Sequence, residues 1–158
     1  MEINVLIEAG LKGCLDDNWL RLVAERVLVA AGASPNAELS LVIATQQKIQ
    51  ELNRNYLGRD EPTDVIAFPM LSGGRVLRPF VPPPDGVNHL GEVIISYPQA
   101  VIQAEDYQHS IKREIAVLII HGVLHLLGYE DEKPALKRLM SAREKEILSC
   151  VEYELDLG

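Results

Sequence analysis

The chain has 158 residues, a mass of 17.5 kDa and a formal net charge of -8, from 23 acidic residues against 15 lysines and arginines. Hydrophobic residues make up 47% of the chain and charged residues 24%, which excludes a disordered chain and provides for the core of one domain. The acidic balance excludes non-specific binding of nucleic acid or of an anionic membrane by the average surface, but it leaves room for a local basic site.

Hydrophobic patterning and capping residues predict four strands and five helices. The strands are expected at 3–8, 38–44, 63–68 and 91–96, and the helices at about 17–31, 46–57, 98–107, 110–127 and 134–150. Residues 71–89 contain paired glycines and three consecutive prolines, and we expect a loop there. The fold class is therefore α+β: a single domain in which a small mixed four-stranded sheet packs against about five helices.

Other features of the sequence favour a soluble cytoplasmic protein. Cys14 and Cys150 lie near opposite ends of the chain, as expected of reduced and partly buried thiols rather than of a disulfide framework. The first ten residues do not have the composition of a signal peptide, and no stretch approaches the roughly 18 apolar residues of a membrane-spanning helix. We therefore expect no membrane partner.

The segment 114–131 carries the strongest functional signal. Its helical part is apolar nearly all round, which predicts a buried helix, yet it contains His121 and His125. A spacing of four residues places both imidazoles on one face, with their Cβ atoms about 5–6 Å apart. Two such rings can bind one transition-metal ion through ring nitrogens. This pattern predicts a metal-binding helix like that of the zincins.

A third ligand is expected just after the helix. Gly128 allows the chain to reverse, which would return Asp131 toward the histidines, with Glu130 as the alternative ligand. Glu114 lies two turns before His121 on nearly the same side, so we expect it to hold one histidine ring from the outer shell.

Two alternatives to a catalytic metal centre follow from the same residues. A histidine on an apolar helix is often a core residue bonded to a backbone carbonyl, although two at this spacing are harder to satisfy without solvent. A zinc protease of the HExxH type has its general base directly after the first histidine, where this chain has Gly122. Glycine cannot act as a base, so peptide hydrolysis is disfavoured.

Three segments in order resemble one known family. HGVLHLLGYED (121–131) is similar to the HGxLHLxGYDH signature of the YbeY-type metal-dependent endoribonucleases, the bacterial ribosomal-RNA maturation factors. LNRNYLGRDEPTDVIAFP (52–69) and LGEVIIS (90–96) match further family segments. The likeness extends over nearly the whole chain.

The resemblance implies a zinc-dependent endoribonuclease that prefers single-stranded RNA. It also implies action on the 3′ end of small-subunit ribosomal RNA and in ribosome quality control, with no DNA partner. His121 and His125 match family metal ligands, and Asp131 stands where the family has a third histidine. An aspartate oxygen can also bind zinc, or another divalent transition metal.

A second difference from the family lies at Leu57, where the family usually has an arginine. We hypothesise that Arg54 or Arg59 supplies this charge near the scissile phosphate. Residues 48–81 hold five basic residues against four acidic ones, so this segment is the candidate for phosphate contacts. Within it, Arg75 and Arg78 fit either phosphate contacts or ordinary solvated charges.

Three more polar residues are candidates for the site. Thr63 and Asp64 follow Pro62 and could order the wall of the site or merely shape a turn. Glu92 is a weaker candidate for the general base.

Alternative functions are a ribosome assembly factor with a mainly structural metal, and a metal-dependent hydrolase of another substrate. The sequence does not define the oligomeric state.

Overall fold

The computed structural model describes residues 1–59, 63–69, 88–155 and 157. Within these ranges the strands are β1 (Glu2–Ile7), β2 (Ala37–Ala44), β3 (Val65–Pro69) and β4 (Asn88–Ser96). The helices are α1 (Asp17–Ala30), α2 (Gln46–Leu57), α3 (Tyr97–Asp106), α4 (Ile111–Leu126) and α5 (Pro134–Glu154). A short 3₁₀ turn at Ala9–Leu11, which the sequence analysis did not predict, follows β1. The predicted α+β class, with four strands and five helices, is confirmed.

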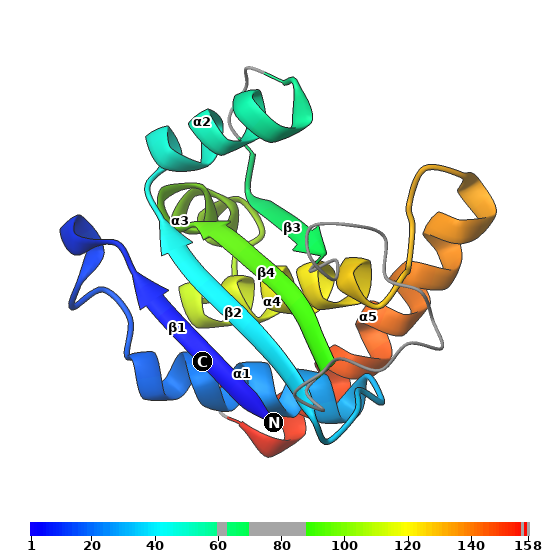
Figure 1. Cartoon of the computed structure of the whole chain (residues 1–158). Helices are drawn as coiled ribbons and strands as arrows, with labels where there is room; N and C mark the ends of the chain where they lie inside the picture. Colours follow the sequence, from blue (N-terminus) through cyan, green and yellow to red (C-terminus); the bar gives the residue numbers. More distant parts are fainter. Residues whose placement is uncertain (60–62, 70–87, 156, 158) are drawn as a thin grey trace.

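The four strands form one mixed sheet in the order β1-β2-β4-β3 (Figure 1). β2 pairs parallel with both β1 and β4, whereas β3 pairs antiparallel with β4. The β3–β4 ladder runs from Val65 opposite Ile95 to Pro69 opposite Gly91. β3 is therefore an edge strand, and its outer side is available to form the wall of a site.

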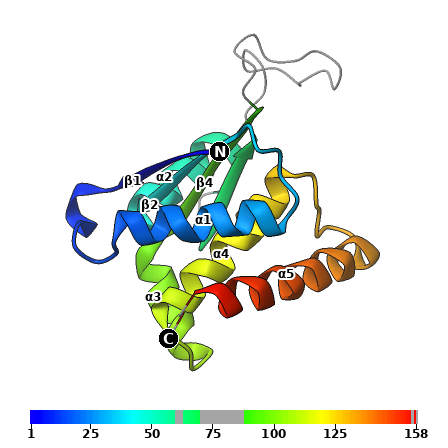
Figure 2. The same cartoon turned by 90° about the horizontal axis from the view of Figure 1, so that it is seen from below.

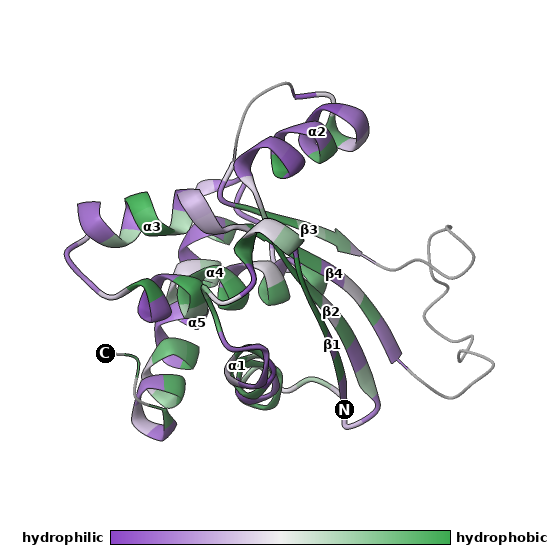
Figure 3. Ribbon diagram, turned by 90° about the vertical axis from the view of Figure 1, so that its left-hand side faces the viewer, coloured by the Kyte–Doolittle hydropathy of each residue, from purple (hydrophilic) through white to green (hydrophobic). Residues whose placement is uncertain are grey.

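Helices α1, α4 and α5 lie on one side of this sheet, as the edge-on view in Figure 3 and the view from below in Figure 2 both show. Val93 and Ile95 of β4 belong to the main core, which these helices complete. Ile94 points the other way and packs with Ile49 of α2 and Ile66 of β3 in a smaller cluster. Successive residues of β4 thus face different helices, as the alternation of a strand requires.

Short polar side chains begin helices α1 to α4, and glycine ends α2. Asp16, Thr45, Ser96 and Ser110 each accept a hydrogen bond from a backbone N–H in the first turn of the helix that follows. Gly58 ends α2 with φ 72°, in the left-handed region that glycine adopts without steric cost. These caps place the ends of the helices close to the positions predicted from the sequence.

Helix α4 lies unusually close to β4. A Cβ atom on Gly122 would come within 2.6 Å of Cγ1 and 2.9 Å of Cγ2 of Val93. Glycine at this position lets the helix axis approach the sheet, because any larger residue would overlap a stiff β-branched side chain. The position after His121 therefore has no room for the glutamate of an HExxH protease.

Several expectations need correction. β3 begins at Val65 rather than at residue 63, and β4 begins at Asn88, so Asn88 and His89 belong to a strand and not to the predicted loop. The remainder of that loop, with Arg75 and Arg78, lies outside the described residues. Cys14 and Cys150 are free thiols, but both are exposed rather than partly buried.

Among the described residues, no helix has both the length and the apolar character needed to cross a membrane.

We expect Gly122→Ala to lower the free energy of unfolding by about 1–2 kcal/mol, because the overlap with Val93 outweighs the helix propensity that alanine gains. Denaturant unfolding of the metal-free protein measures this change. Gly10→Ala is the control, because a Cβ there meets no atom within 4 Å. Val93→Ala should reduce the cost of Gly122→Ala in the double variant. A Gly122→Ala variant as stable as the parent would show that this contact does not restrict the site.

Candidate metal centre

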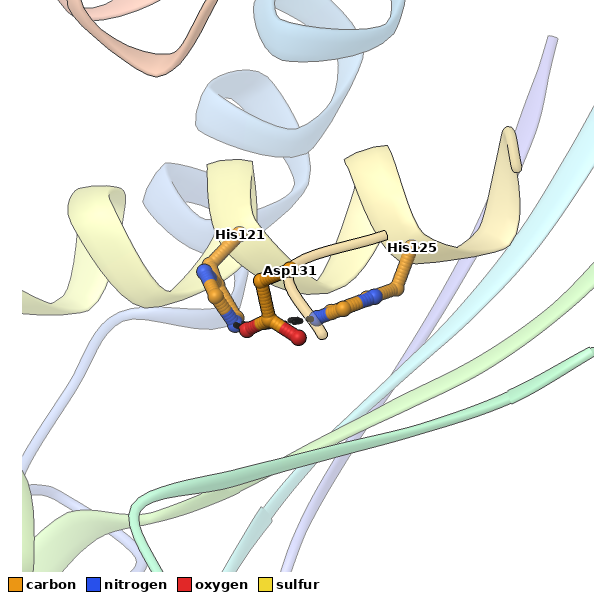
Figure 4. Close-up of side chains that lie close together, drawn as sticks. All are labelled: His121, His125 and Asp131. Atoms are coloured by element: carbon orange, nitrogen blue, oxygen red, sulfur yellow. Dashed lines mark hydrogen bonds and ion pairs between the residues drawn. The ribbon is translucent and has the colours of Figure 1, made fainter. Parts of the chain in front are cut away.

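The last two turns of α4 carry His121 and His125 on the face that looks toward β3. The helix ends in a tight turn in which Gly128 has φ 100° and the N–H of Tyr129 donates to the carbonyl of Leu124 at 2.9 Å. The turn returns the chain along the histidine face, so that Asp131 lies beside both rings (Figure 4). The structure thus brings together the three residues that the sequence analysis proposed as ligands.

The ligand atoms of these residues converge on one point. Nε2 of His121 lies 3.1 Å from Nε2 of His125, and Oδ2 of Asp131 lies 4.0 Å and 3.8 Å from the same two nitrogens. Ligand atoms at about 2.0–2.1 Å from a tetrahedral zinc ion are roughly 3.4 Å apart. The observed spacing is close to this value, so the three residues fit one metal ion.

The hydrogen bonds of the other ring nitrogens explain why the site favours a cation. Nδ1 of His121 lies 3.3 Å from the Glu144 carboxylate, and Nδ1 of His125 lies 3.1 Å from the backbone carbonyl of Tyr129. Both partners only accept hydrogen bonds, which favours a proton on each Nδ1, so that a ring in its neutral form presents an Nε2 lone pair to the site. Two lone pairs and the Asp131 carboxylate therefore face one another, and a metal ion or a proton relieves their repulsion.

These ligands lie in an open pocket of about 640 Å³. One wall is β3, and the opposite wall is the histidine face of α4 together with the turn that follows it. The end of α2 contributes further lining through Asn53, Leu57 and Arg59. His121 and His125 retain 29% and 31% side-chain exposure, whereas most of the other residues of 114–124 are buried. A substrate can therefore reach the histidines from solvent.

Glu144 raises the pKa of His121 above its usual value near 6.5, chiefly through their hydrogen bond. Partial burial opposes this effect, and the negative charges of Glu144, Asp131 and Asp64 reinforce it. A higher pKa means that protons compete more strongly with a metal ion for His121.

The other predicted residues fall into two groups. Arg59, Thr63 and Glu130 line the pocket, and Asp64 lies close enough to influence the charge of His121. Arg54, in the last turn of α2, is exposed and is not part of the described lining.

The structure contradicts the expectations for Glu114 and Glu92. The Glu114 carboxylate accepts hydrogen bonds from His109 and Gln103, so it does not orient the histidine pair. Glu92 has the same strand parity as Ile94, so it points to the side of the sheet opposite α4. It cannot serve as a general base at His121 and His125.

Sequence reasoning missed Glu144 as the partner of His121. Glu144 is 23 residues further along the chain and lies on α5, where acids and bases are mixed. The helical repeat of α4 points to Glu114 as the partner of His121, whereas the observed partner, Glu144, is brought there by the packing of α5 against α4. The sequence carries no signal that would distinguish Glu144 from its acidic neighbours.

The fold and the site define an α+β protein in which a buried helix presents two histidines and a carboxylate to an open pocket, as a metal-dependent hydrolase requires. The family model described as "Endoribonuclease YbeY" matches residues 14–152. The chain belongs to this family.

Curated relatives support this assignment. An Endoribonuclease YbeY of Dehalococcoides mccartyi is 45% identical over 148 residues, which cover 91% of this chain and 86% of the relative. One from Chloroflexus aurantiacus is 39% identical, with 94% of each chain covered. The solution structure of TM1509 from Thermotoga maritima has the same fold, with a TM-score of 0.63, 23% identity, and coverage of 96% of this chain and 90% of that one.

Glu144→Gln should lower the pKa of His121 toward its usual value, because a neutral amide stabilises the imidazolium less than a carboxylate does. NMR titration of the metal-free protein measures this pKa, and Glu146→Gln on the same helix is the control. Equal His121 pKa values in Glu144→Gln and the parent would contradict the assignment.

The same substitution should change the pH dependence of stability. A raised folded-state pKa adds stability that is fully present below the unfolded pKa and is lost as pH rises through the folded value. Glu144→Gln should therefore destabilise the metal-free protein most at acidic pH, and the difference should fade above the His121 pKa. Denaturant unfolding at several pH values checks this trend.

Proposed function

We propose that this protein is a zinc-dependent endoribonuclease that cleaves single-stranded RNA and acts on the 3′ end of small-subunit ribosomal RNA. The observation that carries the proposal is the convergence of three ligand atoms within 4.8 Å of one another, in a chain of the Endoribonuclease YbeY family. Two nitrogens and one carboxylate oxygen suit Zn²⁺, and other divalent transition metals can use the same set.

His121, His125 and Asp131 would hold the ion, while Glu144 and the Tyr129 carbonyl would orient the two rings by accepting from their Nδ1 atoms, so that both Nε2 atoms face the site. With three protein ligands, a fourth position would remain for water or substrate, as in catalytic rather than structural zinc sites, which are closed by four protein ligands. When bound, zinc supplies Lewis-acid polarisation and lowers the pKa of water.

The remaining chemistry belongs to residues of the pocket. Arg59 offers a planar, permanently charged group to the scissile phosphate and would stabilise the charge that develops there. Leu57, at the position where the resemblance leads us to expect arginine, also lines the pocket and is 52% exposed. Besides Asp131, the carboxylates of the described lining are Glu130 and Glu132, and these remain to accept a proton.

The charge of the protein bears on the partner. Among the described lining residues, Arg59 is the one arginine or lysine, against three acids, and the whole chain carries -8. Because this surface repels phosphate, we expect weak binding to free RNA and a dependence on the small ribosomal subunit for positioning.

Removing the metal should abolish cleavage of a single-stranded ribosomal-RNA fragment, and adding Zn²⁺ should restore it. His121→Ala and Asp131→Ala should each lower zinc affinity by at least about 100-fold, since even the loss of an outer-shell partner costs 10- to 100-fold. Glu132→Ala, a pocket residue outside the ligand set, is the control for zinc affinity alone. Metal analysis and gel-based cleavage assays provide the readouts.

Three results would argue against this proposal. Cleavage that survives chelation would exclude a catalytic metal, and binding to the small subunit without cleavage would favour the assembly-factor alternative. Full metal content in Asp131→Ala would mean that Glu130 or water, and not Asp131, is the third ligand.

Arg59→Ala should lower kcat/KM for RNA on the order of 100-fold, because it removes the charge nearest the phosphate. Arg54→Ala should cost less, and Lys48→Ala, at the far end of α2, should change little. Leu57→Arg should restore much of the activity to Arg59→Ala by placing a guanidinium on the same wall. Equal losses in the three single variants would contradict a specific role for Arg59.

A further inference from the structure

A buried polar chain connects the start of α4 to the wall of the pocket. Its centre is Glu114, whose side chain is only 2% exposed. A buried carboxylate is costly unless its oxygens are paired. Oε1 faces Nε2 of His109 at 2.7 Å, and Oε2 accepts from Nε2 of Gln103, also at 2.7 Å.

Gln103 carries this connection to Asp64. Its Nε2 also donates to Oδ2 of Asp64 at 3.3 Å, so one amide bridges two carboxylates. The amide orientation is fixed, because carboxylates only accept, while Oε1 of Gln103 accepts from Nε2 of Gln99 at 3.2 Å. Without this amide the Asp64 and Glu114 charges would face each other with no donor between them.

His109 completes the chain at its outer end. To bond the Glu114 carboxylate, its Nε2 must carry a proton. The backbone N–H of His109 donates to Ala104 at 3.0 Å, and its ring contacts the edge of Tyr107. The turn between α3 and α4 thus delivers a fixed donor to Glu114.

Asp64 is where this chain meets the pocket. It immediately precedes β3, whose ladder with β4 starts only at Val65, and its carbonyl accepts from the N–H of Ser96 at 2.9 Å. Its neighbours Thr63 and Val65 both line the pocket across from His121. Because β3 is an edge strand, the anchoring of Asp64 determines where this wall begins.

We propose that Gln103 and His109 are positioning residues: through Glu114 and Asp64 they hold the first residues of the β3 wall at a fixed distance from the metal-binding face of α4. This role rests on the proposed ribonuclease function, since the pocket between these walls would receive the RNA. The polar chain touches none of His121, His125 and Asp131 through a described hydrogen bond, so it governs substrate alignment rather than metal retention.

Gln103→Met tests this role, because it keeps the size of the side chain and removes both donors. We expect kcat to fall about 10-fold, as misalignment near a reacting group can cost up to 100-fold, with zinc content unchanged. Gln99→Met is the matched control, since it removes one bond to Gln103 but leaves both carboxylates bridged. Its kcat should stay within about twofold of the parent.

Substitutions at Glu114 distinguish a role of its hydrogen bonds from a role of its side-chain volume alone. Glu114→Gln can still accept from Gln103 and can donate to His109 if the ring moves its proton, so it should retain much of kcat. Glu114→Leu leaves both partners unpaired and should lose at least as much as Gln103→Met. Similar kcat values for Glu114→Gln and Glu114→Leu would overturn the proposal.

Backbone amide exchange provides a readout that does not depend on RNA cleavage. Gln103→Met should speed exchange at Val65 and Ile66, whereas Gln99→Met should not. A parent protein that cleaves no RNA would refute the proposed function, while the exchange data would still decide the positioning role. The positioning role would be overturned if Gln103→Met exchanged its Val65 and Ile66 amides at the parental rate. It would also be overturned if Gln103→Met had a lower melting temperature but the same kcat as Gln99→Met.

If Gln103→Met does not fold, Gln103→Asn replaces it. Parental kcat and parental amide exchange in Gln103→Asn would likewise overturn the positioning role.

Discussion

The close contact between Gly122 and Val93 sets the height of α4 above the sheet, and the geometry of the site depends on it. Because the helix lies against β4 at this point, His121 and His125 face the neighbouring edge strand β3. The pocket lies between these two histidines and β3. The same contact excludes a side chain directly after His121, so the base that a zinc peptidase carries there has no place.

The electrostatics of the site follow from hydrogen bonds that point away from it. Glu144 and the Tyr129 carbonyl accept hydrogen bonds from the two Nδ1 atoms, so both Nε2 atoms face the Asp131 carboxylate at the centre. An acidic protein can thereby offer a cation a site, and a bound cation would supply positive charge that its surface lacks. The acidic composition excludes a nucleic-acid-coated surface without excluding chemistry on a phosphodiester.

Local signals in the sequence were sufficient for most helix ends and for the convergence of His121, His125 and Asp131. Thr45 and Gly58 act within a turn of the elements that they cap, and the reversal at Gly128 needs only a residue that tolerates positive φ. The pairing of His121 with His125 follows from the helical repeat alone. These features depend on residues a few positions apart, so a single sequence contains all the information required.

Partners that come from distant elements could not be predicted in this way. Glu114 was expected to face a metal histidine, but the packing of α3 gives it His109 and Gln103 instead. The face of Glu92 was ambiguous because Val93, Ile94 and Ile95 are all buried, so no alternation shows which side meets α4. Glu144 reaches His121 only because α5 packs across α4, which no spacing rule records.

Helix α4 carries three kinds of function on one rigid body: the buried carboxylate Glu114, the close contact at Gly122 and the histidine pair near its end. Consecutive residues of an α-helix are rotated by about 100°, so one residue inserted between Glu114 and His121 would turn the histidines away from β3 while Glu114 kept its partners. The length of this segment is therefore more tightly constrained than its composition. In related chains we expect it to vary by substitution and not by insertion or deletion.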